Sequence, residues 1–261
     1  MISVADRAVI ERCRQARRNT HWALLEGLHG LKHALRFDAQ IEAAWTDDHE
    51  TLRSLATTLA PDIVDTLGRL VEPISTQAFA ELSPRPIETG VLAIAARPRI
   101  DESHLAALLE KAPAIWLEDP SHLGNIGAVI RVAAAAGVAA VFVSGHHDPW
   151  SPAALRGSAG LHFALPVLHQ LEPPRSAGPL IAIDPDGDAF RPEDLPTNAL
   201  LAFGSERRGL SASLLDRADQ RLCLPMSPKV SSLNLATAVA AVLYAWRFAH
   251  DRQTPHASPV T

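Results

Sequence analysis

Residues 113–143 read PAIWLEDPSHLGNIGAVIRVAAAAGVAAVFV, two short apolar runs separated by a stretch of small and apolar residues. The runs at 115–118 and 140–143 have the length and composition of buried strands. Between them, Asn125 is a residue type that caps helices, and Gly137 suits the left-handed position that ends one. We therefore expect a strand, a helix and a second strand, the unit from which parallel sheets are built.

The same alternation continues toward the C-terminus. Further short apolar runs occur at 180–183, 200–203 and 222–224, and helical patterns lie between several of them. Residues 234–249 predict a helix that is apolar nearly all round, which requires burial in a core or an interface. The pattern predicts an α/β fold with a mostly parallel sheet covered on both faces.

The N-terminal part of the chain predicts a separate, small α/β domain. Its elements are expected as helices at 1–18, 27–35, 49–59 and 62–71 and strands at 41–45 and 91–95. We expect an N-terminal domain over 1–97, a linker over 98–112, a second domain over 113–251 and a flexible tail over 252–261.

Composition narrows the class of protein. With 261 residues, 47% of them hydrophobic and 20% charged, the chain has the composition of a globular protein. No apolar stretch is long enough to span a membrane, so we expect no membrane segment. Cys13 and Cys223 lie far apart and indicate no disulfide framework, which favours a reducing, cytoplasmic location.

The charge distribution is uneven. A net charge of −5 counts against a nucleic-acid partner, because phosphates are usually contacted by a basic surface. Basic residues nevertheless crowd the first 36 positions: Arg7, Arg12, Arg14, Arg17, Arg18, Lys32 and Arg36. This stretch is either a solvated helix face or a surface for RNA.

Three segments after expected strands carry polar residues that suggest chemistry. In the first, Arg131 is the one charged residue of an apolar helix, and it needs either an anion or an ion pair with Glu118 or Asp119. The second is LLAFGSERRGL at 200–210, in which Glu206 follows a strand and a glycine. That segment alone is equally compatible with a surface turn.

The third segment is LCLPMSPKVSSLNL at 222–235. Ser231, Ser232 and Asn234 gather where a helix begins, and backbone amides there lack partners. Capping by one of the serines explains one of these three polar residues and leaves two for another role.

Two further clusters are interpreted as ordinary structure. His146, His147 and Asp148 are adjacent and have no partner pair at metal-ligand spacing, so no metal site is expected. The acidic stretch 184–188 lacks the glutamate that completes a calcium loop, and we interpret it as a turn.

Together the three segments resemble the motifs of the SPOUT superfamily, in particular its TrmH-like (SpoU) branch of S-adenosylmethionine-dependent RNA 2′-O-ribose methyltransferases. The matching features are Asn125 with Arg131 six residues on, the run 203–206, and the run 224–226 with 232–234. The resemblance covers about residues 113–249. Residues 19–36 also resemble the start of that family's N-terminal substrate-binding domain.

The resemblance implies a fold and binding partners. It implies a deep trefoil knot at the C-terminus, a homodimer, and an RNA substrate, either transfer or ribosomal. S-adenosylmethionine would be bound by the residues that match the family's cofactor loops: Gly204, Leu224, Met226 and Leu233.

The resemblance also implies which side chains shape the reaction site: Asn125, Arg131, Glu206, Ser232 and Asn234. Arg131 acts there either as the base for the 2′-hydroxyl or as a clamp for the adjacent phosphate, and a guanidinium that stays protonated suits the second role. Pro228 and Ser231 depart from the family's usual glycine and glutamate, which puts the local loop shape in doubt.

Two other functions were weighed. A non-catalytic RNA-binding relative would have no need for the intact Asn125, Arg131, Glu206 and Ser232. A dinucleotide-dependent oxidoreductase would need a third glycine in the turn at 124–127, which the sequence lacks.

Overall fold

The strand–helix–strand pattern of residues 113–143 is present in the computed structural model, which describes residues 2–250. Strand β5 (Ala114–Leu117) is followed by helix α7 (Leu123–Ala136) and by strand β6 (Val141–Val143), which pairs with β5 in parallel. Gly137 ends α7 in the left-handed conformation, as predicted. The prediction that Asn125 caps this helix was wrong, because the cap position is His122 and Asn125 lies in the first turn.

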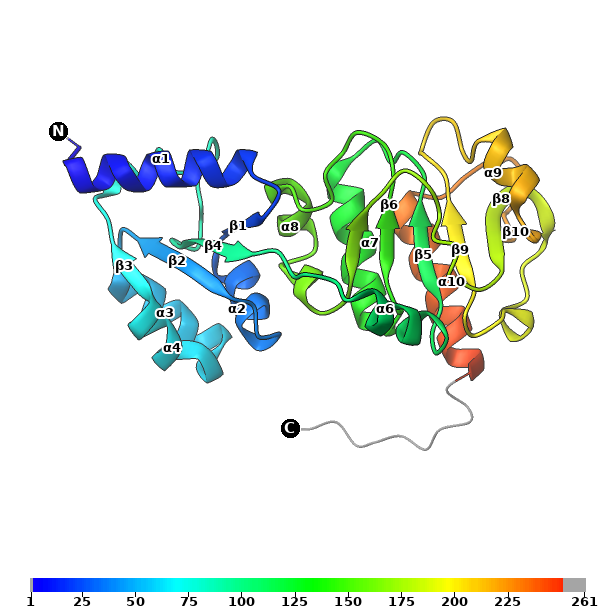
Figure 1. Ribbon diagram of the computed structural model, residues 1–261, viewed down its shortest axis with the longest axis horizontal. Helices are drawn as coiled ribbons and strands as arrows, with labels where there is room; N and C mark the ends of the chain where they lie inside the picture. Colours follow the sequence, from blue (N-terminus) through cyan, green and yellow to red (C-terminus); the bar gives the residue numbers. More distant parts are fainter. Residues whose placement is uncertain (1, 251–261) are drawn as a thin grey trace. The chain divides into compact units, whose positions relative to one another are not determined.

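The chain divides into two units, of which the second comprises Ile100–His147 and Val167–Thr261. Its sheet has six strands in the order β10-β8-β9-β5-β6-β7, and every neighbouring pair is parallel (Figure 1). The remaining strands are β7 (Val167–His169), β8 (Leu180–Ala189), β9 (Leu200–Phe203) and β10 (Gln220–Cys223). The predicted α/β fold with a mostly parallel sheet is confirmed, with β7 as an addition.

Helices cover this sheet. They are α6 (Glu102–Leu109), which lies within the stretch expected as a linker, α9 (Ala212–Arg217) and α10 (Leu235–His250). Helix α10 packs against α7. All four residues of β5 are buried, as expected for a central strand of a parallel sheet with both faces covered.

The acidic stretch that we interpreted as a turn belongs to β8, so that interpretation was wrong. The ladder between β8 and β10 pairs Arg221 with Ala182 but the next residue, Leu222, with Asp188. Residues 183–187 therefore bulge out of the ladder with β10.

The first unit comprises Met1–Arg99 and Asp148–Pro166. Its sheet has the order β1-β4-β2-β3 and contains both antiparallel and parallel pairs. The strands are β1 (Trp22–Glu26), β2 (Ile41–Thr46), β3 (Val71–Pro73) and β4 (Leu92–Ala96). The helices are α1 (Val4–Arg18), α2 (Leu28–Arg36), α3 (His49–Leu59), α4 (Val64–Leu70), α5 (Thr76–Phe79) and α8 (Pro152–Gly157).

Residues 148–166 return to the first unit after β6. Arg97 Nη2 donates to Asp148 at 2.7 Å, and Arg156 of α8 forms an ion pair with Glu26 at the end of β1. Within the returning segment, His162 is fully buried, and this burial lowers its pKa to about 4. Its ring bonds Ser158 Oγ and the carbonyl of Pro149, both at 2.7 Å. The two ion pairs therefore tie this segment to residues 1–99, and the buried hydrogen bonds of His162 hold the segment's own shape.

The part of the chain that the structure describes contains no helix long and apolar enough to cross a membrane. Over the same residues, no group of three or more His, Cys, Asp or Glu side chains is placed to hold a metal ion.

Candidate active site

The three segments singled out in the sequence follow β5, β9 and β10, whose carboxyl ends lie along one edge of the parallel sheet. Ligands of open α/β sheets bind beyond this edge. The segment after β5 leads into α7, the one after β9 turns back at Gly209, and the one after β10 leads into α10.

Hydrogen bonds join these three segments at Glu206. The Asn125 amide donates to Glu206 Oε1 at 2.5 Å, and the Ser121 backbone N–H donates to Glu206 Oε2 at 2.9 Å. The Asn234 amide in turn donates to Asn125 Oδ1 at 3.1 Å. Three of the five expected reaction-site residues thus form one continuous network, here called the Glu206 junction.

The electrostatics of the junction favour an ionised glutamate. Burial acts to raise the pKa of Glu206, but hydrogen bonds from Asn125 and Ser121 to the carboxylate lower it by more. The pKa of Glu206 consequently lies below its ordinary value. A carboxylate that stays ionised keeps both Asn125 and the segment after β5 oriented.

The N-terminus of α10 is capped by Asn234, whereas the sequence suggested capping by one of the serines. Asn234 Oδ1 accepts from the backbone N–H groups of Ala236 at 3.0 Å and Thr237 at 3.4 Å. Asn234 therefore has two functions: its oxygen caps the helix and its amide nitrogen holds Asn125. Ser231 and Ser232 are exposed and remain available to a ligand.

A cavity of about 600 Å³ lies at the ends of β8, β9 and β10. Its lining includes all four residues expected to bind the cofactor: Gly204, Leu224, Met226 and Leu233. Glu206 and Ser232 also line it, so it adjoins the Glu206 junction. The volume falls in the range of small-molecule sites, roughly 300–1,000 Å³.

Gly204 is required by a close backbone approach. A Cβ atom at this position would overlap the backbone of Gly209 and Leu210, because the segment closes on itself through a Ser205–Gly209 bridge. The glycine thus shapes the short loop that presents Glu206.

Arg131 does not line this cavity. It is exposed, and among residues 2–250 it has no ion pair with Glu118 or Asp119, which instead bond Ser211 and Arg208. Six residues correspond to about 240° of helical rotation, so Arg131 and Asn125 lie on different faces of α7. The internal ion-pair explanation for Arg131 is therefore wrong, and its cation faces solvent.

Sequence reasoning missed several residues around this edge. Asp184 and Pro185, which directly follow the part of β8 that pairs with β9, line the cavity. Asp119 adopts a positive φ of 44° and its carboxylate pairs with Arg208, and with His146 Nδ1 at 3.4 Å. The signal available in the sequence was the position of these residues just after the apolar runs 115–117 and 180–183.

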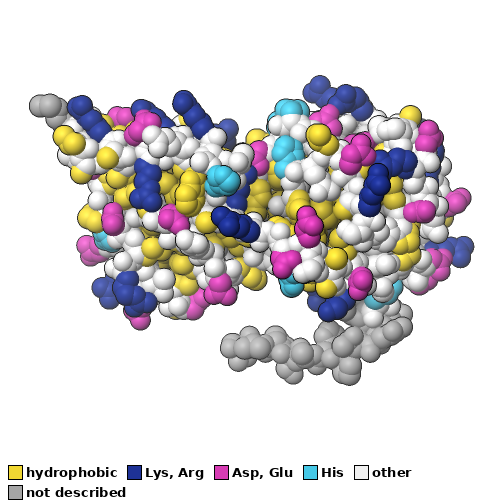
Figure 2. All heavy atoms as spheres, in the orientation of Figure 1, with side chains coloured by type: hydrophobic (Ala, Val, Ile, Leu, Met, Phe, Trp, Pro, Cys, Tyr) yellow, Lys and Arg dark blue, Asp and Glu magenta, His cyan; other side chains and the backbone are white. Residues whose placement is uncertain are grey.

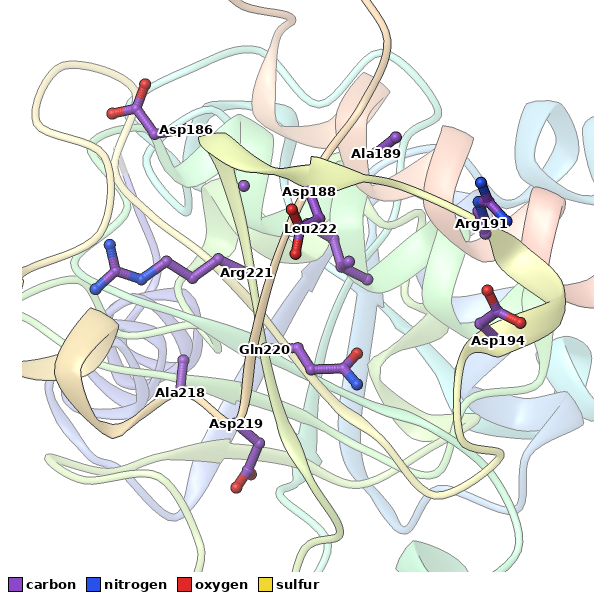
Figure 3. Close-up of a pocket in the computed structure, with 11 residues that line it drawn as sticks. Asp186, Asp188, Ala189, Arg191, Asp194, Ala218, Asp219, Gln220, Arg221 and Leu222 are labelled. Atoms are coloured by element: carbon purple, nitrogen blue, oxygen red, sulfur yellow. The ribbon is translucent and has the colours of Figure 1, made fainter.

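A second cavity, of about 660 Å³, lies farther along β8 and β10 (Figure 3). Its lining carries charges of both signs, including Asp186, Arg191, Asp194, Asp219 and Arg221. It shares no lining residue with the cavity at the Glu206 junction and contains none of the expected site residues.

Comparisons with known proteins agree with this geometry. Residues 112–244, which include all the expected site residues, match the model of the SpoU rRNA Methylase family. The 23S rRNA (uridine(2479)-2'-O)-methyltransferase of Streptomyces viridochromogenes is 32% identical over 229 residues, which cover 80% of this chain and 74% of that protein. The 23S rRNA (guanosine(2553)-2'-O)-methyltransferase RlmP of Bacillus subtilis is 26% identical, over 88% of this chain and 90% of that protein.

Solved structures show the same fold. The SpoU methyltransferase AviRb from Streptomyces viridochromogenes, crystallised with AdoMet, superposes with a TM-score of 0.75 at 24% identity. The match covers 95% of this chain and 99% of that one. The family match over residues 112–244, the 32% identical relative and the strand-end site together establish that the chain belongs to the SpoU rRNA methylase family.

Proposed function

We propose that this protein transfers the methyl group of S-adenosylmethionine to a ribose 2′-hydroxyl of transfer or ribosomal RNA. The observation that carries the proposal is the Glu206 junction, which joins three strand-end segments beside a cavity of about 600 Å³. Both named relatives are 23S rRNA 2′-O-methyltransferases, which favours ribosomal RNA.

The residues of the cavity suit this cofactor. Leu224, Met226 and Leu233 offer apolar surface to a nucleoside, and backbone groups at the strand ends offer hydrogen bonds. When bound, S-adenosylmethionine supplies a methyl group already activated by its sulfonium.

The chain's own contribution is positioning. The junction formed by Asn125, Glu206 and Asn234 fixes the wall of the cavity against which the ribose must lie, and Ser232 is exposed at its rim. Holding reactants in line contributes about 7–11 kcal/mol to such a transfer. Arg131 serves as a clamp for the phosphate next to the target ribose, because a planar, permanently charged guanidinium suits that role.

A homodimer brings Arg131 to the site. Thr237, Ala241, Tyr244 and Phe248 are exposed at spacings of 4, 3 and 4 residues, so they share one face of α10, and Phe248 is 65% exposed. This face lies on the helix that packs against α7, which carries Arg131. We place the dimer contact there and assign Arg131 to the cavity of the partner subunit.

The C-terminal segment adopts the trefoil knot in this proposal. Its support is the course of the chain, which passes through the exposed segment 225–234 after β10 and returns to pack α10 on α7. A threaded segment of this kind holds the cofactor loops in one shape.

The N-terminal unit binds the RNA substrate. Arg7, Arg14 and Arg18 are exposed and, at spacings of seven and four residues, lie along one face of α1. Figure 2 shows Lys and Arg side chains over this helix. In this proposal the substrate-binding domain comprises residues 1–97 and 148–166, and the methyltransferase domain 113–147 and 167–251. The enzyme works in the cytoplasm with its RNA.

Two measurements test the function. S-adenosylmethionine, but not NAD, should raise the melting temperature of the purified chain, because a ligand that binds only the folded state stabilises it. Mapping of ribose methylation in cellular RNA, with and without this protein, should then show one or more sites that depend on it. No shift at saturating cofactor, together with an unchanged methylation map, contradicts the proposal.

A further inference from the structure

Strand β8 contributes an acidic side chain to the cofactor cavity at the point where its ladder with β9 ends. Ile183 of β8 pairs in register with Phe203 of β9, and the residues that directly follow, Asp184 and Gly204, both line the cavity. Asp184 therefore lies at the carboxyl edge of the sheet, beside the loop that presents Glu206.

The bulge in β8 sets the orientation of this carboxylate. Because residues 183–187 leave the ladder with β10, Asp184 is not committed to that pairing. The Asp186 backbone N–H donates to Asp184 Oδ1 at 3.0 Å, which fixes one oxygen. Over residues 2–250, Asp184 Oδ2 has no hydrogen-bond partner.

Asp184 is the carboxylate of this cavity with an oxygen that has no partner among the described residues. The charged residues in the described lining are Asp184, Glu206 and Arg207. Both oxygens of Glu206 are already engaged by Asn125 and Ser121. A ligand that needs a carboxylate acceptor in this cavity meets Asp184.

The position of β8 in the sheet indicates which part of the cofactor contacts Asp184. The sheet order places β9 between β8 and β5, so Asp184 lies one strand farther from the Asn125 segment than Glu206 does. The reacting end of the cofactor has to face the Glu206 junction. Its nucleoside then extends toward β8.

We propose that Asp184 binds the vicinal hydroxyls of the cofactor ribose, an inference that rests on the proposed function. Asp184 Oδ2 can accept from one ribose O–H, and Oδ1, which holds a single hydrogen bond, keeps a lone pair for the neighbouring O–H. An acidic side chain recognises ribose hydroxyls in dinucleotide-binding α/β folds. Asp184 is thus a cofactor-binding residue in addition to the four that the sequence indicated.

The test compares Asp184→Asn with the matched control Asp186→Asn. Asp186 lies two residues on, is exposed, and lines the separate cavity of Figure 3. Binding of S-adenosylmethionine, S-adenosylhomocysteine and 5′-methylthioadenosine to the full chain is measured by calorimetry. The last ligand keeps the ribose but lacks the amino-acid end. Asp184→Asn should weaken all three by the same factor, about ten- to a hundred-fold, and Asp186→Asn should weaken none.

A second measurement changes the ligand, and its wild-type arm needs no variant. Removing the ribose 2′-hydroxyl from 5′-methylthioadenosine should cost the wild-type protein a comparable factor, and cost Asp184→Asn little more. A loss confined to the two ligands with an amino-acid end, or unchanged affinity in Asp184→Asn, overturns the ribose contact. If the wild-type chain binds none of the ligands, the proposed function itself fails.

Discussion

At the scale of single residues, the Glu206 carboxylate determines how three segments of the chain meet. It accepts from Asn125 and Ser121, and its lowered pKa reflects those two donors acting against burial. Since the folded pKa lies below the unfolded one, this contribution to stability is present above the ordinary glutamate pKa. It is lost as the pH falls through the lower, folded value.

Replacing Asn125 with alanine should therefore raise the pKa of Glu206 toward its ordinary value, because the side-chain donor that lowers it is gone. Carboxyl carbon NMR titration of the variant measures this directly. Asn234→Ala is the comparison, since Asn234 contacts Asn125 and not the carboxylate, and it should give a smaller change. Equal titration of Glu206 in Asn125→Ala and wild type would show that the junction does not control this group.

The residues of the junction could be named from the sequence, but their contacts could not. Asn125, Glu206 and Asn234 stood out as polar residues after apolar runs. Asn234 was grouped with two serines, and only the hydrogen bonds show that it caps α10 while they stay exposed. Asp184 was set aside because its neighbours resembled a turn, and its place depends on a bulge that pairing with a distant strand creates.

At the scale of elements, the loop from Gly204 to Gly209 depends on a backbone crossing with no room for a side chain. Gly204→Ala should open the Ser205–Gly209 bridge and displace Glu206, which costs about 1–3 kcal/mol of stability and weakens cofactor binding. Chemical unfolding and calorimetry measure the two effects.

Gly124→Ala is the matched control for that substitution. No atom lies within 4 Å of a Cβ built at Gly124, which sits in the first turn of α7. This variant should be neutral or gain up to about 1 kcal/mol, because alanine is the better helix former. A Gly204→Ala protein as stable as Gly124→Ala would contradict the steric explanation.

Strands that are continuously apolar could be predicted from the sequence, and the short elements β7 and α8 could not. The apolar runs that became β5, β6, β9 and the first part of β8 were visible because buried parallel strands are continuously apolar. Strand β7 has only three residues, and α8 only six, so neither carries a repeat long enough to recognise.

At the scale of the whole molecule, assignment of Arg131 to the partner's cavity predicts complementation between inactive chains. Arg131→Ala and Asn234→Ala should each abolish methyl transfer. Mixed and allowed to exchange subunits, they should recover about a quarter of wild-type activity, because half of the dimers carry one intact site. Radiolabelled methyl transfer to RNA measures the recovery. Arg131→Ala mixed with itself is the blank, and a mixture no more active than that blank excludes the shared site.

The first unit depends on its second chain segment. Glu26 is 4% exposed and is paired with Arg17 at 2.8 Å and with Arg156 of the returning segment. Arg156→Ala should cost about 1–3 kcal/mol, because it leaves a buried carboxylate short of a partner. Urea unfolding of the full chain measures the loss. Arg53→Ala, an exposed arginine on α3, is the comparison and should stay within about 0.5 kcal/mol of wild type.

The return of residues 148–166 to the first unit has a consequence for how such proteins diversify. A recognition module joined at one point can be exchanged by a single recombination event. Under the RNA-binding role proposed for the first unit, any graft that exchanges this unit must replace two separated stretches of the gene together, including the one that encodes the partners of Glu26 and Arg97. Chimeras built with one breakpoint near residue 99 would take residues 1–99 from one protein and residues 148–166 from another. The contacts between these two stretches would then be mismatched.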